Sequence, residues 1–295
     1  FKTKKGIVKA VNGVSYRVEP GKTLGIVGES GSGKTTVIRA VLGLLAGGGK
    51  VTEGSITFEG EDLLSYTPEQ WRKLRGSDIS MIFQDSGAMM NPTRKVGKVF
   101  TEYILTHENI SKKEAWSKGI AMLERMRLPS PDNIMESYPF QLSGGMRQRV
   151  GIAMGMTYQP KLLLADEPTG ALDTETSVQI MELLKEISKD RLIIMVTHNP
   201  ELAMKYSTRI VRLLDGTIVD DSDPYTEEQL KKDIAEGTDK SGTATANGSA
   251  YNSGVSGQGT SISVSKTQRK KKPKTSMSFF TALSLSFNNL MTKKT

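Results

Sequence analysis

A chain of 295 residues can bury a substantial hydrophobic core, either as one large domain or as two modest ones. The absence of cysteine excludes a disulfide framework, a thiolate metal site and a cysteine nucleophile. The formal charge of +8 arises in the C-terminal tail, because the stretch from Lys266 onward holds eight Lys and Arg residues and no acid. The other 32 basic residues balance the 32 acidic ones, so we do not expect a nucleic-acid-binding face spread over the whole protein.

The first half, residues 1 to about 84, is predicted to build strands around a glycine-rich loop. Residues 14–18 and 55–58 have strand-like patterns, and residues 23–27 read as a short buried strand. The next residues have the form G-x-x-x-x-G-K-[ST] and lead into a helical pattern over 35–42. In such a loop, backbone N–H groups surround phosphate oxygens, lysine supplies a charge and threonine a magnesium ligand. The predicted phosphate-binding residues are Gly28, Glu29, Ser30, Gly31, Ser32, Gly33, Lys34 and Thr35.

Polar side chains follow three further apolar strand patterns. Residues 162–165 lead into Asp166 and Glu167, residues 192–197 into His198, and residues 79–83 into Gln84. Because the carboxyl ends of parallel strands face a bound phosphate, we expect Asp166 and Gln84 to help hold magnesium, with Thr35. We expect Glu167 to polarise the attacking water and His198 to help organise it, and the Gln84 amide is also suited to orienting a water. The alternative for Asp166 and Glu167 is a solvated pair of surface acids, and the alternative for His198 is a structural role. We expect His107, which lies in a polar stretch, to be structural.

From about residue 91 to 158 the pattern becomes helical, with apolar spacings that favour core packing. Within it, a Ser-Gly-Gly sequence opens a predicted helix over 145–158. Such a helix start offers free N–H groups, a hydroxyl and a positive dipole end to an anion. The alternative is an ordinary helix cap with a flexible entry. The residues concerned are Leu142, Ser143, Gly144, Gly145 and Met146.

Taken in order, these motifs resemble those of the ATP-binding cassette (ABC) ATPases, from Phe1 to about Asp220. The resemblance implies an α/β P-loop NTPase cassette with a mixed sheet, an antiparallel β-subdomain and an inserted helical subdomain. It also implies ATP and Mg²⁺ as ligands, adenine stacking on Phe1, and a contribution from Thr36. Residues 142–146 then become the signature, which acts in trans in a head-to-tail homo- or heterodimer of cassettes. The D-loop residues are Ala171, Leu172 and Asp173.

Within this family the two halves differ. Up to about residue 162 the chain resembles the ATPases of oligopeptide and dipeptide importers, as in Asn91-Pro92 and Met146-Arg147-Gln148-Arg149. From about residue 165 it resembles MacB-type and lipoprotein-releasing cassettes, as in residues 165–173 and 196–202. The implied cargo is peptides, antimicrobial peptides or lipoproteins. Residues 136–141, just before the signature, are expected near the contact with a membrane permease, fused or separate.

The C-terminal region changes composition twice. We expect a cassette over residues 1–236 and a flexible, partly basic linker over 237–276, rich in Ser, Gly and Thr. Residues 277–295 are predicted to form an amphipathic helix at the membrane surface, because Phe280, Leu283, Phe287 and Leu290 share one stripe beside a polybasic flank. The alternative is a helix that packs back on the domain. No apolar run is long enough to span a bilayer.

The sequence thus predicts an ATP-hydrolysing subunit or domain of a membrane transporter at the cytoplasmic face of the plasma membrane, without a nucleic-acid partner. One alternative is a MacB-like mechanical or regulatory clamp that moves no solute. Another is a soluble ABC ATPase of translation or DNA repair. The last is disfavoured because it calls for two cassettes or a long coiled coil, and the sequence has no internal repeat.

Overall fold

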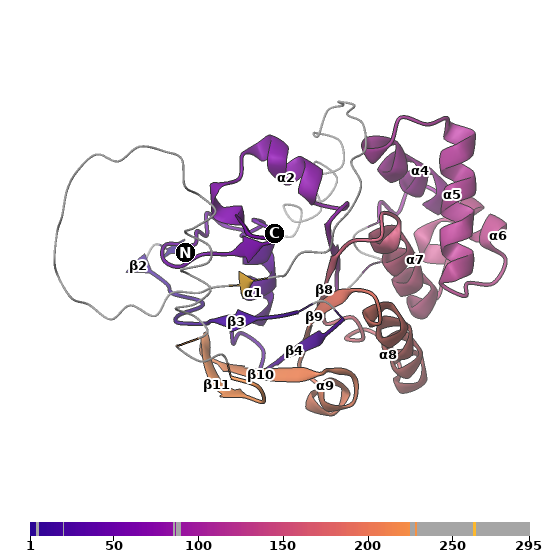
Figure 1. Ribbon diagram of the computed structural model, residues 1–295. Helices are drawn as coiled ribbons and strands as arrows, with labels where there is room; N and C mark the ends of the chain where they lie inside the picture. The colour runs from indigo at the N-terminus through magenta and orange to yellow at the C-terminus, as the bar shows by residue number, and fades with distance from the viewer. Residues whose placement is uncertain are drawn as a thin grey trace.

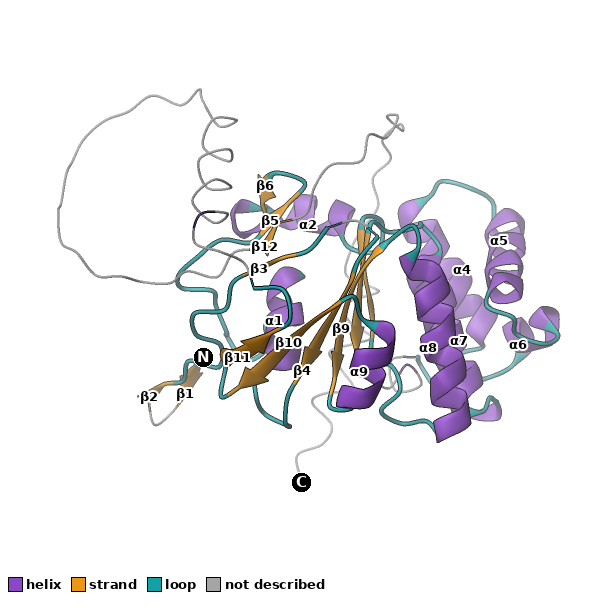
Figure 2. Ribbon diagram, turned by 60° about the horizontal axis from the view of Figure 1, so that its bottom comes forward, coloured by secondary structure: helices purple, strands orange, loops and turns teal. Residues whose placement is uncertain are grey.

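The structure is a computed structural model, and it describes residues 1–3, 6–19, 21–84, 86, 90–224, 228 and 262–263. Its centre is a six-stranded sheet in the order β11-β10-β4-β9-β8-β7 (Figure 2). All pairs are parallel except β10 with β11, so the predicted mixed sheet is confirmed. The strands are β4 (Thr23–Val27), β7 (Ile79–Ile82), β8 (Leu162–Asp166), β9 (Leu192–Thr197), β10 (Arg209–Leu214) and β11 (Thr217–Asp221).

The central strands are almost continuously apolar, as expected for parallel strands covered on both faces. Every residue of β4, β8 and β9 is buried. The register sets Val27 opposite Thr197 and Asp166 opposite Val196. The carboxyl ends of β4, β9 and β8 therefore meet at one edge of the sheet, where the polar residues of the sequence motifs follow.

Helices cover both faces of this sheet (Figures 1 and 2). Alternate residues of β8 face two separate hydrophobic clusters. Leu162 and Leu164 join the cluster that includes α1 (Lys34–Val41), whereas Leu163 and Ala165 join the cluster that includes α7 (Gly144–Met156) and α8 (Thr174–Ser188). This alternation is the period-two geometry of a strand buried on both sides. On the second face, α8 follows the carboxyl end of β8, and α9 (Pro200–Tyr206) follows that of β9.

The helical layer falls within the predicted range of residues 91–158. It comprises α4 (Val96–His107), α5 (Lys112–Arg125), α6 (Pro131–Glu136), the 3-10 turn η2 (Pro139–Gln141) and α7 (Gly144–Met156). Helix α7 begins one residue earlier than predicted, because the Ser143 hydroxyl accepts a hydrogen bond from the Met146 N–H and so caps the helix at residue 143. It ends two residues earlier than predicted, at Met156.

The predicted β-subdomain is present as small two-stranded sheets. Strands β1 (Lys2–Thr3) and β2 (Gly6–Ile7) pair antiparallel, as do β5 (Thr57–Phe58) and β6 (Glu61–Asp62), whereas β3 (Tyr16–Arg17) pairs parallel with β12 (Ile262–Ser263). The turn η1 (Leu63–Ser65) and helix α2 (Pro68–Leu74) follow β6. The strands predicted over 14–18 and 55–58 are shorter than expected, since Val14, Val18 and Ile56 are buried without joining a ladder.

The amphipathic helix predicted over 277–295 lies outside the described residues. Of the linker predicted over 237–276, the described part is Ile262–Ser263. Within the described part of the chain, no helix combines the length and apolar character needed to cross a membrane.

Candidate functional site

The glycine-rich loop connects β4 to α1 and wraps around a buried lysine. Lys34 is 5% exposed, and its Nζ donates to the carbonyl oxygens of Gly28 at 2.8 Å and Glu29 at 2.6 Å. Gly31 and Gly33 adopt φ values of +85° and +97°, which only glycine adopts readily. The loop therefore encircles a cationic group at the N-terminus of a helix, the arrangement that binds phosphate.

The turn between β10 and β11 supports this loop, and the sequence did not predict that contact. The Gly216 N–H donates to Ser32 O at 3.0 Å, and a Cβ added at Gly216 would lie 2.5 Å from Ala10 O. A Cβ added at Gly33 would lie 2.6 Å from the same oxygen. The Asp215-Gly216 dipeptide is a turn signal, but nothing local to it identifies the loop as its neighbour.

The side chains of Thr35 and Asp166 are in contact, although β9 lies between the strands β4 and β8 that lead to them. The Thr35 hydroxyl donates to Asp166 Oδ1 at 2.9 Å, although 131 positions separate the two residues. Burial raises the pKa of the Asp166 carboxyl above its usual range, and the Thr35 hydrogen bond opposes that rise. A hydroxyl beside a buried carboxylate fits Mg²⁺, which is commonly held by one or two protein ligands together with substrate phosphates.

Glu167 and His198 form a second pair at the same edge. The Glu167 carboxylate is hydrogen-bonded to His198 Nδ1, and the Glu167 N–H donates to Val196 O at 2.8 Å. Glu167 has a φ of +47°, a left-handed conformation that is uncommon for a residue with a side chain. His198 is exposed while Glu167 is partly buried, so the pair faces outward from the end of β9.

Gln84 lies two residues beyond the end of β7 and is exposed. A Cβ added at Gly170 would lie 3.1 Å from Gln84 Nε2, so the amide rests over the Gly170 main chain. Gly170 comes three residues after Glu167, and its N–H donates to Glu167 O at 3.0 Å. The structure thus brings Gln84 to the turn that follows Glu167.

The signature residues form a separate group with the D-loop. A Cβ at Gly144 would lie 3.4 Å from Leu172 Cδ2 and 3.9 Å from Ala171 O, and one at Gly145 would lie 2.5 Å from Thr176 Cγ2. Asp173 caps α8, because its carboxylate accepts from the Thr176 N–H at 2.9 Å and hydroxyl at 2.7 Å. In both views α7 lies on the opposite side of the central strands from α1 (Figures 1 and 2).

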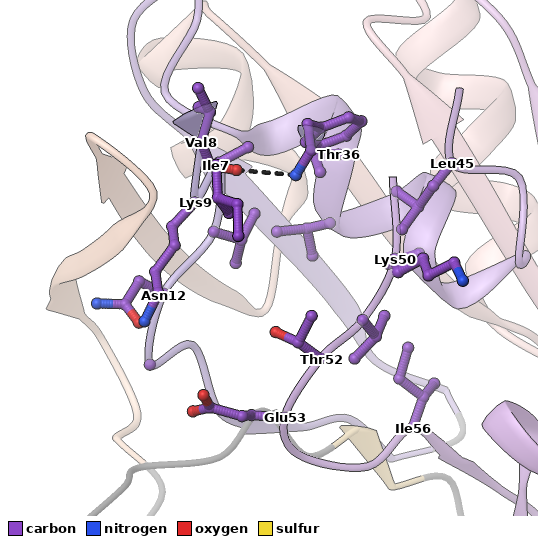
Figure 3. Close-up of a pocket in the computed structure, with 17 residues that line it drawn as sticks. Ile7, Val8, Lys9, Asn12, Thr36, Leu45, Lys50, Thr52, Glu53 and Ile56 are labelled. Atoms are coloured by element: carbon purple, nitrogen blue, oxygen red, sulfur yellow. Dashed lines mark hydrogen bonds between the residues drawn. The ribbon is translucent and has the colours of Figure 1, made fainter. Parts of the chain in front are cut away.

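Phe1 lines a cavity of about 260 Å³ along the flank of α1 (Figure 3). Its ring lies against Gly49, where an added Cβ would be 2.4 Å from Phe1 Cε1, and its amino group donates to Val8 O at 2.9 Å. Thr36, which directly follows the phosphate-binding loop, also lines this cavity. An aromatic ring and aliphatic walls next to that loop fit a purine base. The remaining lining comes from residues 7–13, 50–53, Val37, Ala40, Leu45 and Ile56.

Comparison with known proteins identifies the family. The family described as "ABC transporter" matches residues 11–170. The chain belongs to the ABC transporter family. The matched residues include the phosphate-binding loop, the signature and the Asp166-Glu167 pair, and the family is that of the ATP-binding cassette ATPases, as the motifs predicted.

Several curated relatives are ATP-binding proteins of peptide transport. The cassette is 43% identical to the oligopeptide transport ATP-binding protein OppD of Bacillus subtilis over 223 residues, 75% of this chain and 62% of OppD. It is 46% identical to OppD of Escherichia coli over 201 residues, 68% of this chain and 59% of that protein. The dipeptide transport ATP-binding protein DppD of Haemophilus influenzae is 41% identical over 80% of this chain and 76% of DppD.

The chain spans 59–62% of the length of these two OppD proteins. A match over 80% of the chain necessarily extends beyond residue 165. The similarity to importer ATPases is therefore not confined to the residues before 162, where the sequence pattern first indicated it.

A solved structure with the same fold is the ATP-binding cassette MJ0796, a dimer in a post-hydrolysis state bound to ADP and Pi. It is 28% identical, with a TM-score of 0.66 over 77% of this chain and 95% of that one. The predicted fold class is confirmed.

Proposed function

We propose that this cassette is the ATP-hydrolysing subunit or domain of a peptide transporter, and that two copies close head to tail around two ATP molecules. The observation that carries the proposal is the meeting of Lys34, Thr35, Asp166, Glu167 and His198 at one edge of the sheet. A second supporting observation is that α7, whose start carries the signature and offers an anion-binding helix N-terminus, lies on the opposite side of the central strands from α1. A second copy could bring its own signature to the phosphates.

The residues divide the work of phosphoryl transfer to water. The loop amides and Lys34 hold the phosphate oxygens, and Thr35, Asp166 and Gln84 would hold Mg²⁺. A magnesium ion held there would supply positive charge that offsets the negative charge of the phosphates. The Glu167 carboxylate accepts a hydrogen bond from the attacking water, and His198 fixes the orientation of that carboxylate. The water oxygen forms a bond to the γ-phosphorus as the bond from that phosphorus to the β–γ bridging oxygen breaks, and the products are ADP, phosphate and a proton.

Binding of ATP would hold the two copies together, and hydrolysis would release them, so the chemistry serves motion of the membrane partner. The aromatic pair before the signature supports a contact there: Phe140 is 69% exposed and stacks on Tyr138 with ring centroids 5.5 Å apart. We place the permease contact at residues 136–141 and the cassette at the cytoplasmic membrane face. Attachment of residues 277–295 to the membrane surface is part of the same proposal.

The names of the OppD and DppD relatives favour peptides as the cargo. The second candidate is the MacB-like clamp, which is favoured by the motif forms at residues 165–173 and 196–202. With the membrane partner present, ATP-dependent accumulation of a labelled oligopeptide in vesicles supports the importer, whereas ATP turnover without accumulation supports the clamp.

Glu167→Gln tests the hydrolytic assignment. The amide keeps the shape but cannot accept the water proton, so phosphate release should fall by at least about 100-fold. Because the loop and Asp166 are untouched, ATP with Mg²⁺ should still drive dimer formation in size-exclusion chromatography. Glu186→Gln, which removes an exposed carboxylate paired with Arg127, is the control and should match the parent. Turnover near the parent's rate in the Glu167→Gln variant would overturn the assignment.

A further inference from the structure

A buried amide joins the signature helix to the strand that leads into Gln84. Gln148 lies on the second turn of α7 and is 3% exposed. Its Nε2 donates to Phe83 O at 3.4 Å, and Phe83 is the residue directly before Gln84. A buried amide needs hydrogen-bonding partners, and this one reaches across 65 positions of sequence to the main chain that holds Gln84.

The same face of α7 approaches this segment closely at two further points. A Cβ added at Gly151 would lie 2.5 Å from Ser86 Oγ and 2.8 Å from Ser86 Cβ, and one added at Gly155 would lie 3.2 Å from Ser80 Oγ. Ser86 Oγ itself donates to Phe83 O at 3.4 Å. Positions 148, 151 and 155 share one helix face, so α7 and the residues flanking Gln84 are held as one packed unit.

The other end of this unit is the signature, because Ser143 caps α7 five residues before Gln148. A two-turn helical segment is stiff, so a shift of the main chain at Phe83 moves the signature. Within the dimer proposed above, on which this step rests, Gln84 faces the nucleotide of its own chain and the signature faces the nucleotide of the other. The contact therefore connects two ATP sites.

We propose that Gln148 is a positioning residue that couples the two ATP sites of the dimer, by tying the Gln84 segment at one site to the signature helix at the other. Coupling of this kind appears as cooperativity in ATP hydrolysis. Gln148 does not contact the nucleotide in the proposed dimer, so replacing its amide should leave nucleotide binding by the phosphate loop unchanged.

Gln148→Met in the full chain tests the proposal, because methionine fills the space of glutamine without a donor. We expect the Hill coefficient for ATP in steady-state hydrolysis to fall from above one in the parent toward one. The affinity for a fluorescent ADP analogue measures nucleotide binding by the phosphate loop. It should stay within about twofold of the parent, because the substitution removes the coupling between the sites and leaves each binding site intact. Gln179→Met removes an exposed glutamine that accepts from Arg149, and its Hill coefficient should match the parent's.

A second pair of variants separates coupling from simple loss of packing. Gly151→Ala forces α7 away from Ser86 and should also lower the Hill coefficient, whereas adding Ser86→Gly removes both atoms that the new methyl group would meet and should restore it. The proposal is overturned if the parent hydrolyses ATP as a dimer without cooperativity, or if Gln148→Met keeps the parent's Hill coefficient. A parent that forms no ATP-dependent dimer would instead overturn the head-to-tail arrangement itself.

Discussion

At Glu167 the main chain and the side chain are fixed together. The left-handed backbone, with a φ of +47°, is held by the hydrogen bond to Val196 O, and the carboxylate is held by His198. Uncommon backbone conformations that the surroundings enforce are concentrated at functional sites. Asp166, one residue earlier, ends β8 in extended backbone. The change of conformation between two adjacent acids fits the different roles proposed for them, Asp166 toward the metal and Glu167 toward water.

His107 provides a pH-dependent test at the residue scale. Its ring packs against Tyr158 and Tyr103, with centroids 4.9 and 5.3 Å away, and burial lowers its pKa, with Arg72 adding to the effect and Glu108 opposing it. The unfolded chain then binds the proton more readily than the folded one. The ordinary pKa of histidine is about 6.5. As the pH falls below that value, the free energy of unfolding decreases, and this decrease ends once the pH is below the pKa of His107 in the folded protein.

We expect His107→Phe, which keeps the ring contacts and cannot titrate, to lose less stability than the parent when the pH falls from about 7.5 to 5.5. Urea unfolding at a series of pH values measures the difference. Parallel stability curves for parent and variant would contradict a lowered pKa of His107 in the folded protein.

At the scale of elements, α2 holds the far end of the phosphate-loop helix. Arg75 directly follows α2, and its Nε and Nη2 donate to Leu42 O at 2.9 Å and Gly43 O at 3.1 Å, just beyond the last turn of α1. The same guanidinium lies 4.6 Å from the ring centroid of Trp71. A cation at the C-terminus of a helix satisfies its free carbonyl groups and its dipole. Helix α1 is thus capped at one end by the loop and at the other by Arg75.

Arg75→Met should lower the free energy of unfolding by about 2–3 kcal/mol, the sum expected for two hydrogen bonds and a cation–π contact. The measurement is chemical denaturation without nucleotide. Lys73→Met, which removes an exposed charge with a 3.8 Å contact to Glu69, should change it by less than about 1 kcal/mol. Equal effects of the two substitutions would show that Arg75 does not cap α1.

The elements differ in how far their sequence predicted them. The apolar runs before Asp166 and His198 are long and buried on both faces, so their pattern located β8 and β9 to within a residue. Residues 14–18 and 55–58 have the same kind of pattern, but only two residues of each range pair in a strand. The pattern there reflects the burial of the apolar side chains and not strand length. The support of the phosphate loop by Gly216, and the burial of Gln148 against Phe83, arise from contacts between distant segments that no local spacing encodes.

At the scale of the whole molecule, two hydrophobic clusters divide the cassette. One gathers α1, the phosphate-loop strand and the small sheets, and the other gathers the helical layer with α7 and α8. The sheet separates them, so α1 and α7 lie on different sides of it (Figures 1 and 2). In the proposed head-to-tail dimer, a second copy completes each ATP site with its own signature.

Mixing two inactive variants tests this central claim most directly. Lys34→Ala removes the phosphate-loop cation, and Gly144→Asp places a negative charge at the signature helix start, where the nearest atom to the new Cβ is 3.4 Å away and the dipole tolerates an acid. Each variant alone should lose at least about 100-fold in ATP hydrolysis. A mixed dimer contains one site built from two undamaged halves, so combining the proteins should restore hydrolysis above that of either variant. Absence of recovery in mixtures that form dimers would contradict a site shared between two chains.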